Sequence, residues 1–120
     1  MKNDPARTPV FLRHILEAIT RISDYTQGMS AEDFARNLLV QDAVIRNIEI
    51  MGEAARNIEV LDPSFAAKHP EIPLRDVYLM RNRVAHGYFS VDVAIVWNSV
   101  ETEIPELERL IRQVLQADYP

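Results

Sequence analysis

The sequence predicts an all-α fold, an up-down bundle of four to five helices. Apolar residues recur at three- and four-residue spacing along most of the 120 residues, as they do on the buried face of an amphipathic helix. No segment keeps the alternation of a β-strand for long. Glycine is rare, with three residues, and the seven prolines stand at the edges of the periodic segments. Together these observations favour helices joined by short connections.

The first helix is expected from Thr8 to about Gln27. Thr8 and Pro9 form a good N-cap and N1 pair, and Gly28 is expected to stop the helix. The apolar stripe of this helix consists of Leu12, Ile15, Leu16, Ile19 and Ile22.

A second helical segment is predicted from Ser30 to Leu61. Ser30 and Asp33 resemble a capping box in which Asp replaces the usual Glu or Gln. The segment is expected to break near Gln41-Asp42, and the small residues around Gly52 let another helix approach closely. Its apolar stripe consists of Phe34, Leu38, Val44, Ile45, Ile48 and Met51.

Prolines and one glycine mark the remaining boundaries. A short turn of helix is predicted over residues 63–69, and a further helix over residues 73–86 ends at the glycine that follows His86. Asp92 begins the last helical stretch. Pro105 either kinks this stretch or restarts it, and both alternatives stay open.

Length and composition limit the class of protein. The chain has the usual size of one domain, so we expect a single domain over residues 1–120, with enough apolar content (48%) for a core. The absence of cysteine excludes disulfides and thiolate metal sites. We expect a cytoplasmic protein without a membrane span. The net charge of −5 disfavours tight binding of duplex nucleic acid, although a local basic pocket is compatible with it.

The most informative segment is residues 80–89. On a helical wheel Arg81 falls on the apolar side, with Val77 and Val84, whereas Asn82 falls on the polar side. A guanidinium in that position needs a carboxylate partner, a dimer interface, or a cleft open to an anionic ligand.

His86 follows Arg81 by five positions, at the expected end of the helix. An imidazole beside a permanent cation suits phosphodiester cleavage, because His can transfer protons while Arg neutralises charge on the phosphoryl oxygens. This chemistry needs no metal or other cofactor. A salt bridge and a helix cap are the more frequent roles of such a pair. The other two histidines, His14 and His69, lack the Asp/Glu spacing of a metal site.

Three further residues have two interpretations each. Asn82 either orients His86 from one turn earlier or faces water. Tyr88 either buries its ring or exposes a hydroxyl open to modification. Glu53 either pairs with Arg81 across the bundle, which we favour, or lies on a solvated face.

The spacing of Arg81, His86 and Tyr88 resembles the signature of HepT toxins in the HEPN superfamily. Residues 41–46 (Gln-Asp-Ala-Val-Ile-Arg) and 51–54 (Met-Gly-Glu-Ala) resemble the "QDA…IGEA" segment of this group, with Met51 in place of the usual isoleucine. The resemblance covers the chain from about Pro9 to Leu115. Its downstream part includes Phe89, Val91-Asp92, Val96-Trp97 and Pro105-Glu106-Leu107.

The resemblance implies a HEPN-like homodimer that acts as the toxin of a type VII toxin-antitoxin system. It implies a metal-independent endoribonuclease with Arg81 and His86 as catalytic residues and Asn82 in support. The implied partner is a minimal nucleotidyltransferase antitoxin, which adds AMP to Tyr88 and so blocks RNA from the cleft. The alternative is a non-catalytic helical subunit that binds a nucleotidyltransferase or a nucleotide.

Overall fold

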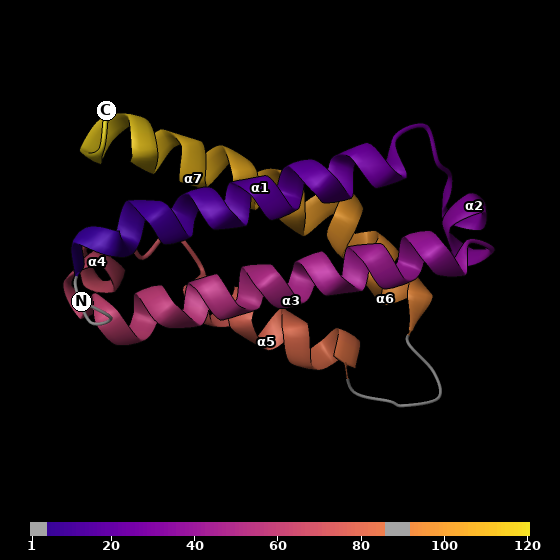
Figure 1. Cartoon of the computed structure of the whole chain (residues 1–120), viewed down its shortest axis with the longest axis horizontal. Helices are drawn as coiled ribbons and strands as arrows, with labels where there is room; N and C mark the ends of the chain where they lie inside the picture. Colours follow the sequence, from indigo (N-terminus) through magenta and orange to yellow (C-terminus); the bar gives the residue numbers. More distant parts are fainter. Residues whose placement is uncertain (1–4, 86–91) are drawn as a thin grey trace.

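In the computed structural model, residues 5–85 and 92–120 are described, and every regular element in them is helical (Figure 1). The predicted all-α bundle is thus confirmed. In the described residues, no helix combines the length and the apolar content that crossing a bilayer requires. The elements are η1 (Pro5–Arg7), α1 (Thr8–Thr26), α2 (Ala31–Ala35), α3 (Leu38–Leu61), α4 (Pro63–Lys68), α5 (Leu74–Ala85), α6 (Val93–Asn98), the π-helical η2 (Ser99–Glu103) and α7 (Ile104–Asp118).

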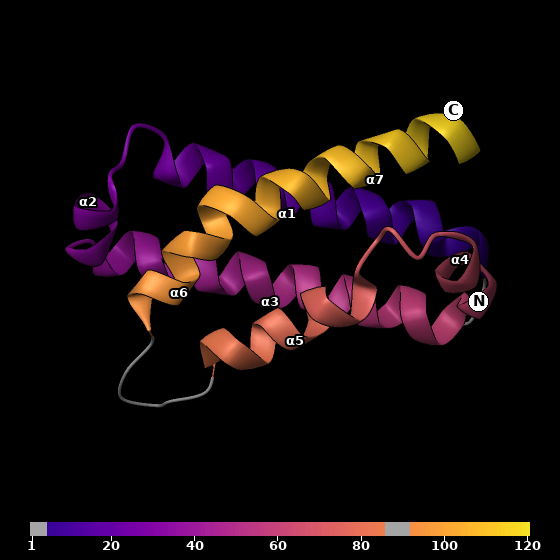
Figure 2. The same cartoon turned by 180° about the vertical axis from the view of Figure 1, so that it is seen from behind.

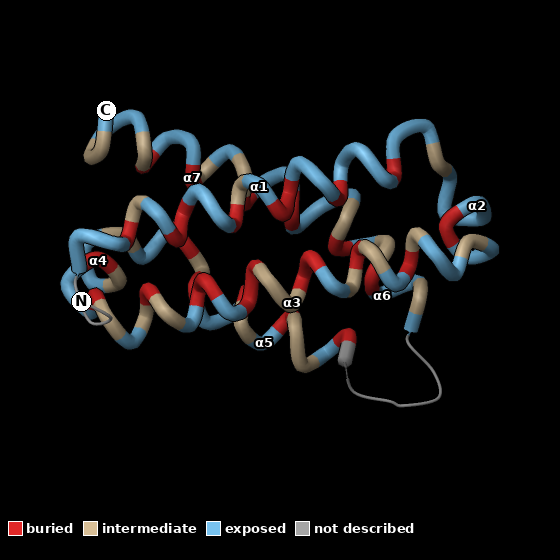
Figure 3. The backbone as a smooth tube through the Cα atoms, viewed as in Figure 1, coloured by how far each residue is buried: buried red, intermediate tan, exposed pale blue. Residues whose placement is uncertain are grey.

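Helix α3 is the central element of the bundle. It packs against α1 along one side and against α5 along the other (Figure 1), while α6, η2 and α7 cross behind them (Figure 2). Figure 3 shows the buried positions recurring along each long helix. Fully buried side chains from three helices meet in the core, and they include Leu12, Ile15, Ile48, Met51 and Ile111.

Most predicted helix boundaries are confirmed, but Thr8 is the first residue of α1 and not its N-cap, which is Arg7. Helix α1 ends at Thr26, and Gly28 has a φ of 76°, in the left-handed region that favours glycine. The capping box is present: the Ser30 hydroxyl accepts from the Asp33 N–H (3.1 Å), and the Asp33 carboxylate accepts from the Ser30 N–H (3.0 Å). The Asp92 carboxylate accepts from two N–H groups in the first turn of α6.

The break between α2 and α3 lies at Asn37, so its predicted position near Gln41 is wrong. The Asn37 side chain accepts a hydrogen bond from the Val40 N–H (3.0 Å) and caps α3. The buried Gln41 amide donates to the carbonyl oxygens of Phe34 (2.8 Å) and Ala35 (3.1 Å). The Phe34 carbonyl also accepts from the Asn37 N–H (3.2 Å), so Gln41 adds a second donor to the last turn of α2, and it joins the two helices instead of separating them.

The backbone stays helical from α6 through η2 into α7, past Pro105. The N–H of Ile104 donates to the carbonyl of Ser99, five residues earlier, which is the spacing of a π-helix. Pro105 has no N–H and cannot bond in the α-helical pattern. The wider π turn accommodates this loss, so the chain does not restart at Pro105, and of the two alternatives the distorted but continuous helix is the one that the structure shows. The Trp97 ring of α6 lies 5.1 Å from the Phe34 ring of α2.

A histidine cluster ties the C-terminal end of α7 to the connection between α4 and α5. His69 Nδ1 lies 2.9 Å from Glu71 Oε2, and His69 Nε2 lies 2.6 Å from Asp118 Oδ2. Lys68 Nζ lies 3.2 Å from the same Asp118 oxygen. Burial lowers the pKa of His69, but its hydrogen bonds to Glu71 and Asp118 raise it more, and the net pKa is above the ordinary value.

The His69 cluster makes stability depend on pH. Because the folded pKa of His69 is raised, its contribution is fully present below the unfolded pKa of about 6.5 and is lost as pH rises through the folded value. We expect the free energy of unfolding, measured by urea titration, to fall on going from about pH 6 to about pH 8. The His69→Gln variant should show a flatter profile. Identical profiles for the two proteins would contradict this assignment.

Candidate active site

Helix α5 turns Arg81 toward α3. The four residues Leu74, Val77, Met80 and Val84 are buried, and Arg81 is half-buried. Arg81 therefore belongs to the packed side of the helix, as the helical wheel predicts, and it is not a freely solvated surface arginine.

Gly52 of α3 makes room for Arg81. A methyl group on Gly52 would lie 3.1 Å from the Cβ of Arg81, 3.5 Å from its Cδ, and 3.5 Å from the carbonyl oxygen of Val77. The two helices thus approach so closely that a side chain at this position would have to push Arg81 aside by a few tenths of an ångström, and the aliphatic part of Arg81 lies against the backbone of α3. The predicted role of small residues around Gly52 is confirmed.

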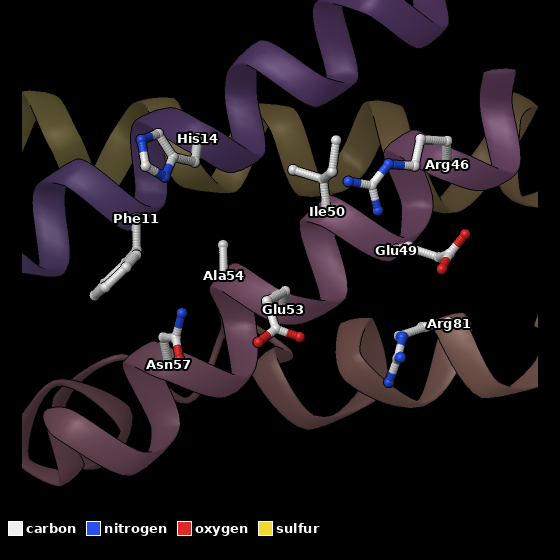
Figure 4. A pocket seen from close by; sticks show the side chains of 9 residues that line it. All are labelled: Phe11, His14, Arg46, Glu49, Ile50, Glu53, Ala54, Asn57 and Arg81. Atoms are coloured by element: carbon white, nitrogen blue, oxygen red, sulfur yellow. The ribbon is translucent and has the colours of Figure 1, made fainter.

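Arg81 opens onto a hollow of about 290 Å³ on the face formed by α1, α3 and α5 (Figure 4). We call it the α3 hollow, because most of its wall belongs to α3. Charges of both signs line it. The lining residues are Phe11 and His14 of α1, Arg46, Glu49, Ile50, Glu53, Ala54 and Asn57 of α3, and Arg81 of α5.

The charged side chains of the α3 hollow form no ion pairs within the described residues. Glu53 and Arg81 share the wall but are not paired, so the pairing favoured from the sequence is not formed. Arg83, two residues further along α5, is exposed and pairs with Glu103 at 3.4 Å. Of these two arginines, Arg81 is the one that keeps its guanidinium available for an anionic ligand.

The structure brings only some of the predicted site residues together. His86 and Tyr88 lie outside the described residues. Asn82 is half-buried, and its side chain makes no hydrogen bond to the described part of the chain. Within residues 5–85 and 92–120, no three His, Asp or Glu side chains gather in an arrangement that could hold a metal ion.

Arg46 and Glu49 were not predicted as site residues. With Glu53 they recur at steps of three and four residues, which places them on one side of a helix. That spacing could have indicated a charged stripe, but only the fold shows that the stripe adjoins Arg81.

The site is thus a half-buried arginine, without an ion pair to the described residues, beside an open hollow of an all-α bundle, and its guanidinium can accept an anionic group. The chain belongs to the HepT-like ribonuclease family, because the family model described as "Ribonuclease HepT-like" matches residues 15–114.

Two relatives illustrate the similarity. The chain is 43% identical over 98 residues to a "Probable ribonuclease HepT" of Thermococcus cleftensis. The aligned region covers 82% of this chain and 86% of that protein. It is 35% identical over 108 residues to a "Putative RNase" of Caldanaerobacter subterraneus subsp. tengcongensis, and this aligned region covers 90% of this chain and 94% of that protein. No solved structure matches the chain. The resemblance to HepT proteins and the predicted class of enzyme, a ribonuclease, are confirmed.

The contact at Gly52 predicts that replacing this glycine by alanine lowers the stability of the fold, whereas helix propensity alone predicts that it raises it. Replacing Gly by Ala inside a helix normally stabilises it by about 1 kcal/mol. At Gly52 the added methyl group meets the Arg81 Cβ, which cannot move without α5, so overpacking outweighs this gain. We expect Gly52→Ala to lower the free energy of unfolding by about 1–3 kcal/mol in urea denaturation. A variant more stable than the wild type would show that the helices separate easily at this point.

Proposed function

We propose that this chain is the toxin of a type VII toxin-antitoxin system. It is one domain over residues 1–120 that cleaves RNA in the cytoplasm as a homodimer, without a metal. The observation that carries this proposal is the state of Arg81: half-buried, open to the α3 hollow, and without a carboxylate partner among the described residues. Membership in a ribonuclease family supports RNA as the ligand.

Arg81 binds the phosphate that is cleaved. A guanidinium offers parallel N–H donors to two phosphate oxygens, and it stabilises the charge that grows on them in the transition state. The aliphatic part of Arg81 is confined by Gly52 and the backbone of α3, so less side-chain freedom is lost on binding RNA.

His86, which directly follows the last residue of α5, transfers the protons. As general base it takes the proton of the RNA 2′-hydroxyl, whose oxygen forms a bond to the adjacent phosphorus. The bond from phosphorus to the 5′ oxygen breaks, and the leaving oxygen takes a proton from the His86 of the second copy. The products are a 2′,3′-cyclic phosphate and a free 5′-hydroxyl. Asn82, one turn before His86, supports the imidazole.

Tyr88 is the control point. A minimal nucleotidyltransferase antitoxin transfers AMP to it: the phenol oxygen bonds to the α-phosphorus of ATP, and pyrophosphate leaves. The added phosphate lies two residues from His86 and carries the same charge as the RNA backbone. It therefore excludes RNA both by bulk and by repulsion.

The second candidate is a non-catalytic helical subunit that binds the nucleotidyltransferase or a nucleotide. The net charge of −5 speaks for it, because an acidic protein does not attract RNA over its whole surface. Arg81 favours the ribonuclease. A half-buried arginine with a purely structural role would normally form an ion pair with a carboxylate, and Arg81 forms none within the described residues. Growth arrest on expression without a partner fits only the ribonuclease.

Removal of the catalytic groups should abolish RNA cleavage in a buffer with EDTA. We expect Arg81→Ala to lower the cleavage rate by about 10²–10³-fold, through loss of charge stabilisation. His86→Ala should lower it by about 10²–10⁴-fold, through loss of proton transfer. The matched control is Arg83→Ala, which removes an exposed arginine of the same helix and should cleave at nearly the wild-type rate.

The same four proteins should be expressed alone in cells. Wild type and Arg83→Ala should arrest growth, and the other two should not. If folded His86→Ala still cleaves RNA, or if the wild type neither arrests growth nor cleaves, the catalytic assignment is wrong and the second candidate takes its place.

The modification is tested by mass spectrometry after co-expression with the proposed nucleotidyltransferase antitoxin. We expect the wild type to gain the mass of one AMP group and to lose RNA cleavage. Tyr88→Phe should gain no mass, while Tyr78→Phe serves as a control that should still be modified. Modification of Tyr88→Phe at another residue would refute the role of Tyr88.

A further inference from the structure

The α3 hollow has two ends of different chemistry (Figure 4). We call one the cationic end, which consists of Arg46, Glu49 and Arg81. We call the other the aromatic end, which consists of Phe11, His14, Glu53, Ala54 and Asn57. Every nucleotide of an RNA strand likewise joins two chemistries, a charged phosphate and a neutral aromatic base.

The hollow is larger than a phosphate group alone requires. Its volume of about 290 Å³ is near the lower end of the range for small-molecule sites, about 300–1,000 Å³. When Arg81 binds a phosphate at the cationic end, the aromatic end stays open for the rest of the nucleotide. Along the axis of α3, Asn57 lies about 7.5 Å beyond Gly52, the residue against which Arg81 packs. A nucleotide spans a similar distance from its phosphate to the hydrogen-bonding edge of its base.

Phosphate binding leaves the carboxylate of Glu53 unexplained. Glu53 forms no ion pair with Arg81 or with any other described residue, and a free carboxylate repels a phosphate bound nearby. An ionised carboxylate only accepts hydrogen bonds, so a ligand that contacts it must bring N–H or O–H donors. The part of the ligand beside Glu53 therefore carries donors and no negative charge, as a base does.

The neighbours of Glu53 suit both the flat face and the edge of a base. The rings of Phe11 and His14 lie 6.2 Å apart and are nearly perpendicular, at 76°. Phe11 is buried, whereas the imidazole of the exposed His14 is open to stacking by a base. Asn57 follows Glu53 by four residues and so lies one turn away on the same side of α3. Its half-buried amide makes no hydrogen bond to the described residues, and it can both donate and accept.

We propose that the aromatic end of the α3 hollow is a subsite for a guanine base of the RNA. The Glu53 carboxylate accepts from N1–H and from the 2-amino group of guanine, and the Asn57 amide donates to the guanine O6. The base stacks on His14. This inference rests on the proposed function, because it takes the phosphate at Arg81 to be that of RNA.

The other three bases do not match a carboxylate in this way. Guanine is the base whose Watson–Crick edge has two adjacent donors. Adenine and cytosine each have one amino donor beside a ring nitrogen whose lone pair repels the carboxylate, and uracil has one N–H between two carbonyl oxygens. A carboxylate at this position therefore attracts guanine and disfavours the other three bases.

Nucleotide binding tests the subsite separately from cleavage. We expect the full-length wild type, titrated by NMR with guanosine 3′- and 5′-monophosphates, to bind one of them about 10–100-fold more tightly than the adenosine, cytidine and uridine counterparts. Glu53→Gln should bind the four nucleotides alike, since an amide offers one acceptor group in place of two. The matched control is Glu49→Gln, which removes a carboxylate one turn away, at the cationic end, and should keep the preference.

Cleavage tests whether the subsite acts on RNA. In a random-sequence single-stranded RNA, the cut sites of the wild type and of Glu49→Gln should carry guanine at one of the two positions that flank the broken bond. Glu53→Gln should cut without this preference.

The outcomes separate the subsite from the proposed function. No nucleotide binding by the wild type, equal binding of the four nucleotides, or a preference that Glu53→Gln retains would overturn the subsite. Guanine-selective binding without guanine at the cut sites would also overturn it, and would leave the proposed function standing. A guanine preference that Glu53→Gln abolishes, in a chain that cleaves no RNA, would support the subsite and refute the proposed function.

Discussion

The close approach of α3 and α5 at Gly52 is the constraint on which the rest of the structure depends. Helix α3 contacts both α1 and α5, so its distance from α5 decides how the bundle closes around the core. The same contact leaves the Arg81 side chain no room to sink between the helices and directs it to the open face. Both the packing of α3 against α5 and the direction of the Arg81 side chain thus depend on Gly52. Glycine, the smallest residue, suits both requirements.

Elements defined by local chemistry could be predicted from the sequence. The capping box at Ser30 and the left-handed turn at Gly28 involve only neighbouring residues, and both are present. The break at Asn37 could not be placed, because Gln41 acts through carbonyls six and seven residues away. A polar residue that interrupts an apolar pattern looks the same from the sequence whether it ends a helix or caps its neighbour.

The candidate site could be predicted only in part, for a similar reason. Helical periodicity alone places Arg81 on the packed side of α5. Whether Glu53 pairs with it depends on the distance between two helices and on two long side chains, which periodicity does not contain. The hollow is likewise a property of three helices together, so Arg46 and Glu49 gain meaning only beside Arg81. His86 was singled out by its spacing from Arg81, whereas its catalytic role and the modification of Tyr88 were predicted from a family resemblance and not from geometry.

The π-helical segment η2 sets the direction in which α7 presents its apolar side. Its wider turn uses one more residue than an α-helical turn, so it rotates everything that follows relative to α6. In this way one uninterrupted rod presents its apolar side first to α2, where Trp97 meets Phe34, and then to α1. The extra residue rotates α7 about the helix axis relative to α6. Removing it would turn the apolar stripe of α7 toward the solvent.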